Sequence, residues 1–383
     1  MKNALLLFFS LMSFASCGQP AATQEEEETT PPIGDDFKLK TETILGDRGA
    51  VWGFQFLPDG SIIFTERSGK IGIFANGKVT ELSGVPKVAY ESQGGLLGIA
   101  LHPDYANNGW IYTTYLENAG GNSRMNLIRF KIKDNALTDI QNLHTTSSTN
   151  RWRGHNGSRI VFDKNGYLFW SVGEGGPSSR GGANSPNKNS QNVKESWGKV
   201  HRMTDDGKVP ADNPVLPGNT APTTIYSYGH RNPQGLVLNP ETNEIWETEH
   251  GPRGGDELNV IKKGENYGWP LVSYGINYDG VDISGKKHAG YTEPAFQWTP
   301  SIGACGLAYL SSDKYGSWKG SFFAGGLALN HVSRIYFQDG KAQEEVILKD
   351  VGRVRDVVQG PDGYLYLSLE GPGRIVKVIP EKK

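Results

Sequence analysis

The feature that most constrains the fold of this chain is a turn that recurs six times. Each copy joins Pro, Asp, Asn or Gly residues to a following run of alternating aromatic or β-branched residues. Proline presets the first central dihedral angle of such a turn, aspartate hydrogen-bonds to its own backbone, and glycine accepts a positive φ angle. The repeat therefore predicts short strands in equivalent units. The six copies begin at Phe56, His102, Phe162, Asn239, Asp313 and Gly360.

The repeat predicts one closed β-fold. No segment keeps a 3.6-residue apolar periodicity over four turns, which argues against helical and α/β folds. Glycine makes up 50 of 383 residues, nearly twice the usual share, as expected for many turns. One four-stranded unit cannot bury both of its faces, so such units stack radially on their neighbours. We therefore predict an all-β protein, a six-bladed β-propeller of four-stranded antiparallel blades that spans residues 37–383 as a single domain.

The residues before this domain read as a targeting segment. An apolar run from Ala4 to Met12 follows a basic residue and leads through small residues to Cys17, the layout of an export signal. The run is too short to span a bilayer. A cysteine at the cleavage position is typical of lipoprotein processing, and simple secretion with an incidental cysteine is the alternative. We predict a signal peptide over 1–16 and an acidic, lipid-anchored tether over 17–36, so that the exported protein is a periplasmic or cell-surface lipoprotein.

Two counts exclude other classes of protein. Cys17 and Cys305 are the only cysteines, so acylation of the first leaves no internal disulfide and no thiolate zinc site. Lys and Arg number 39 and Asp and Glu number 41, for a net charge of −2 without a basic stripe. Nucleic acid is therefore not expected as a partner.

Two predicted loops carry residues suited to proton transfer and to charge stabilisation. His155 stands between glycines just ahead of an apolar strand, where a histidine can act as a general base near neutral pH. A loop histidine with only a hydrogen-bonding role is the commoner alternative. Arg231 and Asn232 could bind adjacent carbonyl oxygens, with the arginine stabilising an oxygen that becomes anionic. Their alternative role is to bond one blade to the next.

Two further segments suggest ligands of opposite charge. Residues 249–270 combine carboxylates with backbone carbonyls beside Gly and Pro, which are the oxygen ligands that Ca²⁺ prefers, although no EF-hand spacing is present. Arg353 and Arg355 lie at i and i+2 on one face of a predicted strand. Paired arginines suggest a carboxylated ligand, and a surface salt-bridge ladder is the alternative.

In their order along the chain these segments resemble a known family. The motifs are Gln93-Gly-Gly-Leu-Leu-Gly, His155, Gly229-His-Arg-Asn-Pro-Gln-Gly, Glu249-His-Gly-Pro, Asp256-Glu, Asn266-Tyr-Gly-Trp-Pro, Arg353-Val-Arg-Asp and Gly360-Pro-Asp-Gly-Tyr-Leu-Tyr. This order resembles that of the soluble glucose/sorbosone dehydrogenases, and most closely the aldose sugar dehydrogenases that use pyrroloquinoline quinone (PQQ). The resemblance runs from about Ile44 to Val378.

The resemblance implies an enzyme that oxidises the C1 hydroxyl of aldose sugars to lactones with PQQ and Ca²⁺, and that passes electrons to an external cytochrome or quinone. It implies His155 as the base that removes the hydroxyl proton while hydride passes to the quinone. The implied cofactor contacts are Gln93, Arg231, Asn232, Tyr278, Arg353 and Arg355. The backbone carbonyls of Gly251 and Pro252 would hold the cofactor-bound Ca²⁺, and Glu257 and Tyr267 would bind a second, structural calcium.

Two residues depart from the family pattern. Ala328 stands where relatives carry a lysine for the cofactor, so one positive contact is missing, and Glu174 stands where some glucose-oxidising relatives have Asp. The sequence sets neither the sugar preference nor the electron acceptor. Two other functions use the same fold: a calcium-dependent lactonase, which needs a metal held by side chains in the funnel, and a non-catalytic cell-surface propeller that binds sugar or protein. The presence of His155 with Arg231 and Asn232 favours the dehydrogenase.

Overall fold

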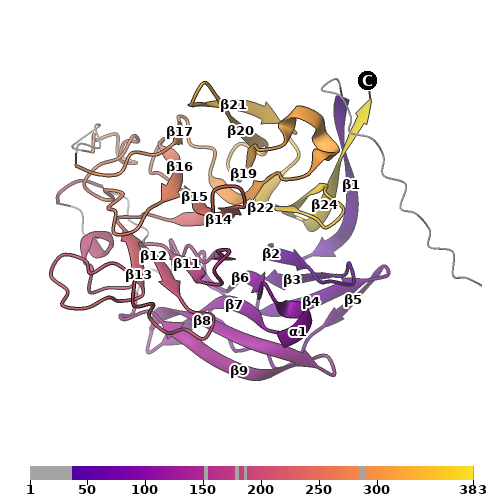
Figure 1. Ribbon diagram of the computed structural model, residues 1–383, viewed down its shortest axis with the longest axis horizontal. Helices are drawn as coiled ribbons and strands as arrows, with labels where there is room; N and C mark the ends of the chain where they lie inside the picture. Colours follow the sequence, from indigo (N-terminus) through magenta and orange to yellow (C-terminus); the bar gives the residue numbers. More distant parts are fainter. Residues whose placement is uncertain (1–36, 151–153, 177–180, 185–187, 284–289, 383) are drawn as a thin grey trace, which may run out of the picture. The chain divides into compact units, whose positions relative to one another are not determined.

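Six four-stranded antiparallel sheets surround a central axis in the computed structural model, which describes residues 37–150, 154–176, 181–184, 188–283 and 290–382. The predicted six-bladed β-propeller is therefore confirmed (Figure 1). The expected signal peptide, tether and Cys17 lie outside the described residues. In the described part of the chain, no helix has the length and apolarity needed to cross a membrane.

Five blades each use four consecutive strands, with the first of the four nearest the axis. The first three blades along the chain consist of β2 (Val51–Phe56), β3 (Ile62–Glu66), β4 (Lys70–Ala75) and β5 (Lys78–Glu81); β6 (Leu96–Leu101), β7 (Ile111–Ala119), β8 (Asn122–Lys133) and β9 (Ala136–Thr145); and β10 (Ile160–Phe162), β11 (Leu168–Val172), β12 (Lys199–Met203) and β13 (Ile225–Tyr228).

The next two blades follow the same plan. They consist of β14 (Pro233–Asn239), β15 (Glu244–Glu249), β16 (Asp256–Ile261) and β17 (Phe296–Trp298); and of β18 (Ala304–Tyr309), β19 (Phe322–Gly326), β20 (Val332–Gln338) and β21 (Lys341–Ile347). Within the described residues, helical structure is confined to short segments in the loops. These are α1 (Tyr105–Asn108) and the 3₁₀ segments η1 (Lys188–Gln191) and η2 (Asp313–Trp318).

The sixth blade closes the ring by joining the two ends of the domain. It contains β22 (Arg353–Gln359), β23 (Leu365–Glu370), β24 (Gly373–Lys382) and, as its outermost strand, β1 (Phe37–Arg48). The β1–β24 pairing extends from Phe37 opposite Lys382 to Arg48 opposite Gly373. Backbone hydrogen bonds of one sheet therefore link the first and last described strands, and no disulfide is needed for closure.

All six predicted turns connect the first strand of a blade to its second, and so they lie at one face of the ring, which we call the turn face. The side chain of Asp59 accepts a hydrogen bond from the Ser61 amide at 3.0 Å, and Gly60 has a φ of 82°. Asp163 accepts two backbone hydrogen bonds of 2.9 Å in the equivalent turn of another blade. The local chemistry behind the sequence repeat is thus present in the structure.

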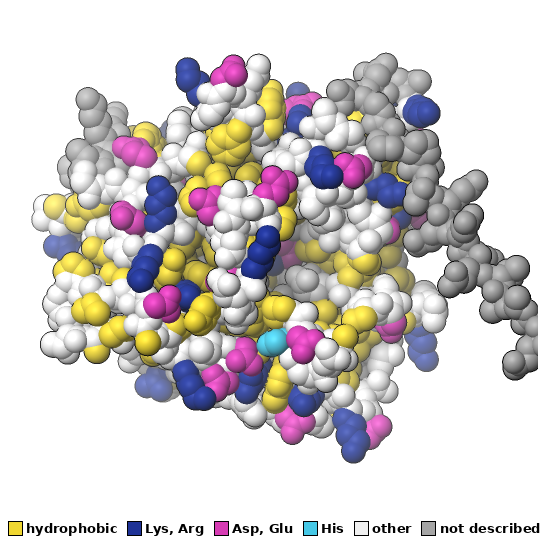
Figure 2. Space-filling view, viewed as in Figure 1, with side chains coloured by type: hydrophobic (Ala, Val, Ile, Leu, Met, Phe, Trp, Pro, Cys, Tyr) yellow, Lys and Arg dark blue, Asp and Glu magenta, His cyan; other side chains and the backbone are white. Residues whose placement is uncertain are grey.

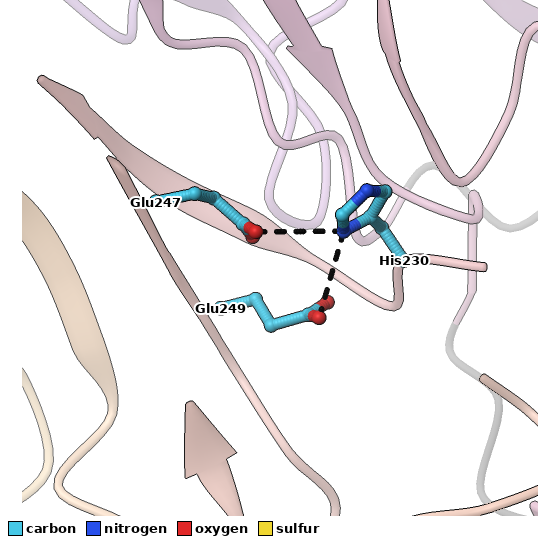
Figure 3. A group of neighbouring side chains, drawn as sticks. All are labelled: His230, Glu247 and Glu249. Carbon is cyan, nitrogen blue, oxygen red and sulfur yellow. Dashed lines mark ion pairs between the residues drawn. The ribbon is translucent and has the colours of Figure 1, made fainter. Parts of the chain in front are cut away.

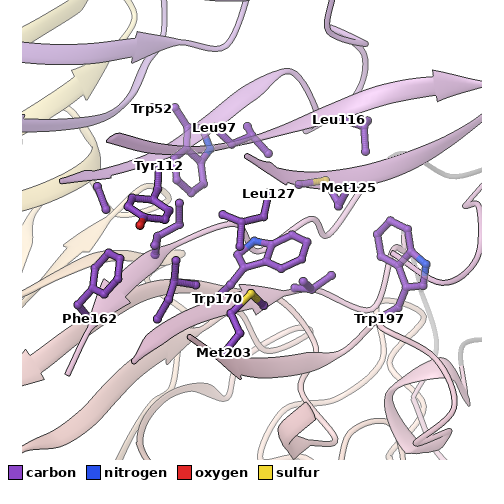
Figure 4. Packing of buried hydrophobic residues seen from close by; sticks show 14 of the residues in the cluster. Trp52, Leu97, Tyr112, Leu116, Met125, Leu127, Phe162, Trp170, Trp197 and Met203 are labelled. Atoms are coloured by element: carbon purple, nitrogen blue, oxygen red, sulfur yellow. The ribbon is translucent and has the colours of Figure 1, made fainter. Parts of the chain in front are cut away.

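The hydrophobic core lies between neighbouring blades. In the largest cluster, Trp170 and Trp197 are fully buried and pack with side chains of the β6–β9 blade such as Met125 and Leu127 (Figure 4). Each blade thus buries its flat faces against the next, as stacked β-units must. Across the face of the molecule seen in Figure 2, basic and acidic side chains are interspersed, and no patch of one sign stands out.

The inner strands are bent at the face opposite the turns, which we call the site face. Five of the six inner-strand pairings contain a register shift close to the start of the inner strand: β2, β6, β14, β18 and β22. Such bulges bend a strand and redirect its side chains, and they are common beside active sites. The inner strands and the loops before them therefore present side chains toward the axis at the site face.

Candidate active site

A cavity of about 300 Å³ opens where the inner strands begin, at the site face. Three of the predicted cofactor residues line it: Gln93, from the loop before β6, and Arg353 and Arg355, from the start of β22. The volume is at the lower end of the range found for pockets that hold small organic ligands. The other lining residues are Trp52, Arg67, Leu97, Asn156, Gly157, Gln234, His250, Gly303, Leu327, Ala328 and Glu370.

The cavity wall carries more positive than negative charge. Its guanidinium groups belong to Arg67, Arg353 and Arg355, while Glu370 is the one carboxylate among the lining residues. Arg355 is buried and contacts Glu370 Oε1 at 2.7 Å, and Arg353 contacts Glu370 Oε2 at 3.4 Å. Burial alone would raise the pKa of Glu370, but the two arginines outweigh it and lower that pKa. Arg353 and Arg355 therefore form salt bridges, as the alternative interpretation expected. Because both share the single carboxylate of Glu370, the cavity wall still carries net positive charge that could bind an anionic ligand.

His155 is held in an uncommon backbone conformation beside this cavity. Its φ angle is 46°, a region that residues other than glycine seldom occupy and that often marks functional sites. The backbone amide of His155 donates to Gln93 Oε1 at 3.2 Å, which links the histidine to the cavity wall. Because the ring is buried, its orientation is set by the protein and not by solvent.

A carboxylate orients the imidazole of His155. Nδ1 lies 2.8 Å from Glu174 Oε1, and Glu174 Oε2 accepts a 3.0 Å hydrogen bond from the indole of Trp269. The Glu174 side chain is fully buried, so it has no exposed surface with which to contact a sugar, and its role is to position His155. With the proton on Nδ1, the second ring nitrogen, Nε2, can accept a proton. Burial lowers the pKa of His155, as does the charge of Arg231, while Glu174 acts in the opposite direction. The imidazole is therefore neutral at pH 7.

Arg231 stands beside the cavity and not in its wall. Its Nη1 donates to the carbonyl oxygens of Gly251 at 2.7 Å and His250 at 3.0 Å, and its Nη2 donates to the Tyr278 hydroxyl at 3.4 Å. The guanidinium also lies over the Trp269 ring, 5.1 Å from its centroid. The structure thus brings Arg231, Gly251 and Tyr278 together, and places the positive charge of Arg231 near His155.

Asn232 ties the histidine loop to the loop that carries Arg231. Its Oδ1 accepts hydrogen bonds from the Gly157 amide at 3.1 Å and from Gln234 Nε2 at 2.9 Å. Its Nδ2 lies 3.2 Å from Nδ1 of His250, whose pKa is held far below the ordinary value by burial and then by Arg355. The neutral His250 ring lines the cavity, so Asn232 acts on the cavity at least through this contact.

A much smaller hollow adjoins the cavity and shares His250 with it. It encloses about 10 Å³, roughly the space of one water molecule or ion. All four predicted metal-binding residues line it: Gly251, Pro252, Glu257 and Tyr267. The Tyr267 hydroxyl is already hydrogen-bonded to the Val260 carbonyl and the Lys262 amide, so only the backbone carbonyl of Tyr267 remains as a possible ligand.

Next to this hollow lies a buried group that the sequence analysis did not single out, and one of its members, Glu249, lines the hollow. His230, Glu247 and Glu249 place ligand atoms within 4.8 Å of one another (Figure 3). His230 Nδ1 is 3.4 Å from Glu247 and 3.6 Å from Glu249. Burial opposes protonation of His230, but the two glutamates raise its pKa to about 9. The spacing of Glu247 and Glu249 at i and i+2 in a strand was the available signal, because it predicts that both point the same way.

The carboxylates here outnumber the cation. Burial raises the pKa of Glu247 to about 7, with a further contribution from Glu249. Burial and then Glu249 also raise the pKa of Glu257 well above its ordinary value. Buried carboxylates that repel one another are stabilised when a divalent cation binds among them, and oxygen ligands favour Ca²⁺. The donor set around the hollow therefore fits a calcium ion.

Fold and site together define a class of protein: a six-bladed propeller with a positively charged cavity at its axis, next to a buried histidine–carboxylate pair. Within that class, the chain belongs to the glucose/sorbosone dehydrogenase family, whose profile matches residues 49–377. The family expected from the sequence motifs is thereby confirmed.

Individual relatives support the same assignment. The chain is 39% identical to the aldose sugar dehydrogenase YliI of Escherichia coli (strain K12) over 341 residues, which cover 86% of this chain and 90% of the relative. The crystal structure of a soluble aldose sugar dehydrogenase from Escherichia coli in its apo form superposes with a TM-score of 0.83 at 36% identity, covering 90% of this chain and all of the other. A PQQ-bound aldose sugar dehydrogenase from Streptomyces coelicolor gives a TM-score of 0.70 at 28% identity, covering 91% of this chain and all of the other.

Proposed function

We propose that this protein is a PQQ- and Ca²⁺-dependent aldose sugar dehydrogenase, which oxidises the C1 hydroxyl of an aldose to the lactone and delivers the electrons to an external acceptor. The observation that carries the proposal is the His155–Glu174 pair, 2.8 Å apart and buried beside a cavity with excess positive charge. The relatives named as aldose sugar dehydrogenases, one of them with PQQ bound, support the same reading.

The positive charge of the cavity wall is complementary to the negative charge of PQQ. PQQ carries three carboxyl groups on a flat ring system, and the wall offers three guanidinium groups against one carboxylate. Guanidinium groups bind carboxylates through two parallel hydrogen bonds, and these are among the strongest polar contacts in proteins. Gln93, Arg353 and Arg355 would hold the cofactor from the cavity wall, with Arg231, Asn232 and Tyr278 beside them.

His155 would start the reaction as a general base. The neutral Nε2 takes the proton from the C1 hydroxyl, and the hydrogen on C1 leaves with its electron pair as a hydride. The sugar thereby loses two electrons and two hydrogens and becomes the lactone. Glu174 keeps Nδ1 protonated throughout and stabilises the positive charge that the ring gains. When bound, PQQ supplies the two-electron acceptor.

Arg231 would stabilise negative charge that develops near it during hydride transfer. Its guanidinium is already oriented by Gly251, His250 and Trp269, so little reorganisation is needed when charge appears. The carbonyls of Gly251 and Pro252 accept hydrogen bonds from Arg231 and Ser301, and each has a second lone pair for a cation. Because the hollow has room for one ion, Glu257 and the Tyr267 carbonyl would hold the structural Ca²⁺ inside it, and the Gly251 and Pro252 carbonyls would hold the cofactor-bound Ca²⁺ toward the cavity.

The two other functions receive less support. A calcium-dependent lactonase needs side-chain metal ligands in the funnel, but none of the three residues in the one side-chain cluster found among the described residues lines the axial cavity. A propeller that only binds sugar or protein has no use for a strained, buried histidine oriented by a carboxylate.

The test is reconstitution of the apoprotein with PQQ, with and without Ca²⁺, followed by dye reduction with a panel of aldoses. We expect His155→Ala to lower turnover by about 10² to 10⁴-fold, while PQQ binding changes much less. His102→Ala is the matched control, because His102 lies at the turn face, and its turnover should equal that of the wild type. Equal activity of the His155 variant and the wild type would show that His155 is not the catalytic base. The proposed function would be refuted if none of the aldoses in the panel supported dye reduction by the wild type.

A further inference from the structure

A third arginine lines the cavity from a different blade. Arg67 directly follows β3, whereas Arg353 and Arg355 begin β22 in the closing blade. Its Nη2 donates to the Ser92 carbonyl at 2.6 Å and its Nε donates to the Gly94 carbonyl at 3.3 Å. The guanidinium also lies over the Tyr90 ring, 5.2 Å from the centroid. Three contacts therefore hold Arg67 in place at the cavity wall.

The charge of Arg67 is less well compensated than that of the other two arginines. Glu370 pairs with Arg353 and Arg355, whereas the described residues place no carboxylate within salt-bridge distance of Arg67. Burial, followed by the repulsion of Arg355, lowers the pKa of Arg67. An anion in the cavity would relieve that repulsion, because it would bring negative charge next to both groups.

The same cavity contains the position at which this chain lacks a cation. Ala328 lines the wall, at the place where the sequence resemblance leads one to expect a lysine. The Ala328 residue is solvent-exposed and leaves that part of the wall uncharged. Arg67 is a positive group in the wall of this same cavity, on a different blade from Ala328.

We propose that Arg67 binds a carboxylate of the quinone cofactor and supplies the positive contact that Ala328 does not provide. The inference rests on the proposed function, since it concerns the same cofactor. It assigns to this chain a cofactor-binding residue outside the motifs that carry the family resemblance.

A purely structural role for Arg67 is the competing explanation, because its two backbone contacts also fix the loop that carries Gln93. Two ligands separate the explanations. PQQ carries three carboxylates, whereas its trimethyl ester has the same rings and no carboxylate. A lost charge contact weakens binding of PQQ alone, but a displaced loop weakens binding of both.

The experiment measures binding of each ligand to the apoprotein with Ca²⁺, by calorimetry or by quenching of tryptophan fluorescence, since Trp52 lines the cavity. Arg67→Ala should weaken PQQ binding about tenfold, as expected for loss of a charge-assisted contact, and should leave ester binding unchanged. Arg67→Lys keeps the charge and should stay within about threefold of the wild type. Arg124→Ala removes the same charge from exposed surface outside the cavity and should have no effect.

A rescue experiment completes the test. Ala328→Lys added to Arg67→Ala should restore most of the lost PQQ affinity, because it returns a cation to the same cavity. The inference is overturned if Arg67→Ala binds PQQ as tightly as the wild type, if both ligands lose affinity equally, or if the added lysine restores nothing. A wild-type protein that binds no PQQ would instead refute the proposed function itself.

Discussion

The two faces of this propeller are built on different principles. At the turn face, six connections repeat one piece of local chemistry, in which a side chain such as Asp59 bonds to a nearby amide and a glycine such as Gly60 takes a positive φ. At the site face no two loops are alike, and each supplies a different functional group, for example His155 or Arg231. The regular face specifies the ring, while the irregular face carries the chemistry.

The difference teaches that stability and activity are largely separable in this molecule. They meet on the axis, where Arg159 donates to Asp356 at 2.7 Å with both side chains buried. The Arg159 guanidinium also lies 4.3 Å from the ring of Trp52, which lines the site cavity. On its other side, the ion pair lines a second axial cavity of about 240 Å³ toward the turn face.

The largest expected effect comes from the point at which the two faces meet. Asp356→Ala leaves the buried Arg159 without its carboxylate, and should lower the free energy of unfolding by about 3 to 5 kcal/mol. Equilibrium urea unfolding measures this. Asp313→Ala breaks an ion pair with Lys319 in which both side chains are largely exposed, and it should cost less than about 1 kcal/mol. Similar losses in the two variants would show that the axial pair does not hold the faces together.

The next largest effect should be confined to the site face. Glu174→Gln should lower kcat/KM about hundredfold, or about 2.7 kcal/mol of transition-state stabilisation, because it no longer fixes the His155 tautomer. The wild-type pKa of His155 is below the usual 6.5, and Glu174 raises it. The acid limb of the wild-type pH profile should therefore lie below pH 6.5, and that of the variant should move lower still. Trp269→Phe, which removes the donor to Glu174 but keeps an aromatic ring beside Arg231, serves as the milder control. An acid limb that moves upward in Glu174→Gln would contradict this account.

The smallest effect should be confined to the turn face. Gly60→Ala places a β-carbon where φ is 82°, although the space around it is open, so the cost is backbone strain of about 1 kcal/mol. Thermal unfolding should report this loss, with turnover unchanged. Gly46→Ala is the matched control, because its new β-carbon would meet only Thr43 at an ordinary 3.7 Å and no positive φ is involved. A fall in turnover for Gly60→Ala would contradict the claim that the turn face affects stability without affecting activity.

The same contrast explains what could be predicted from the sequence. The blade number followed from the turns, because aspartate, proline and glycine act on their immediate neighbours and leave a local signature. The Nδ1 contact of His155 with Glu174 lies at the open end of the β10–β11 hairpin, where the Gly175 amide donates to the His155 carbonyl at 3.1 Å, and it depends on the pairing register of that hairpin. The bulges at the starts of the inner strands depend on packing around the axis, which no local pattern encodes.

Charge clusters formed from distant segments were the hardest to foresee. His230 lies in the loop that leads into β14, and its contact with Glu247 on β15 appears only once that blade is folded. Arg67 reads as one more polar residue after a strand, and only the cavity shows that it shares a wall with Arg355. The family resemblance supplied residue roles that stay predictions, among them the calcium ligands.

The Arg159–Asp356 pair limits how substrate and product reach and leave the site cavity. Its two side chains lie on the axis between the two cavities, so, among the described residues, they close the site cavity on the side toward the turn face. Under the proposed function, the sugar would enter and the lactone would leave at the site face, and the electron acceptor would approach the cofactor from the same face. Oxidation of the sugar and reoxidation of the enzyme would then alternate, because both need access to the cofactor from the same face.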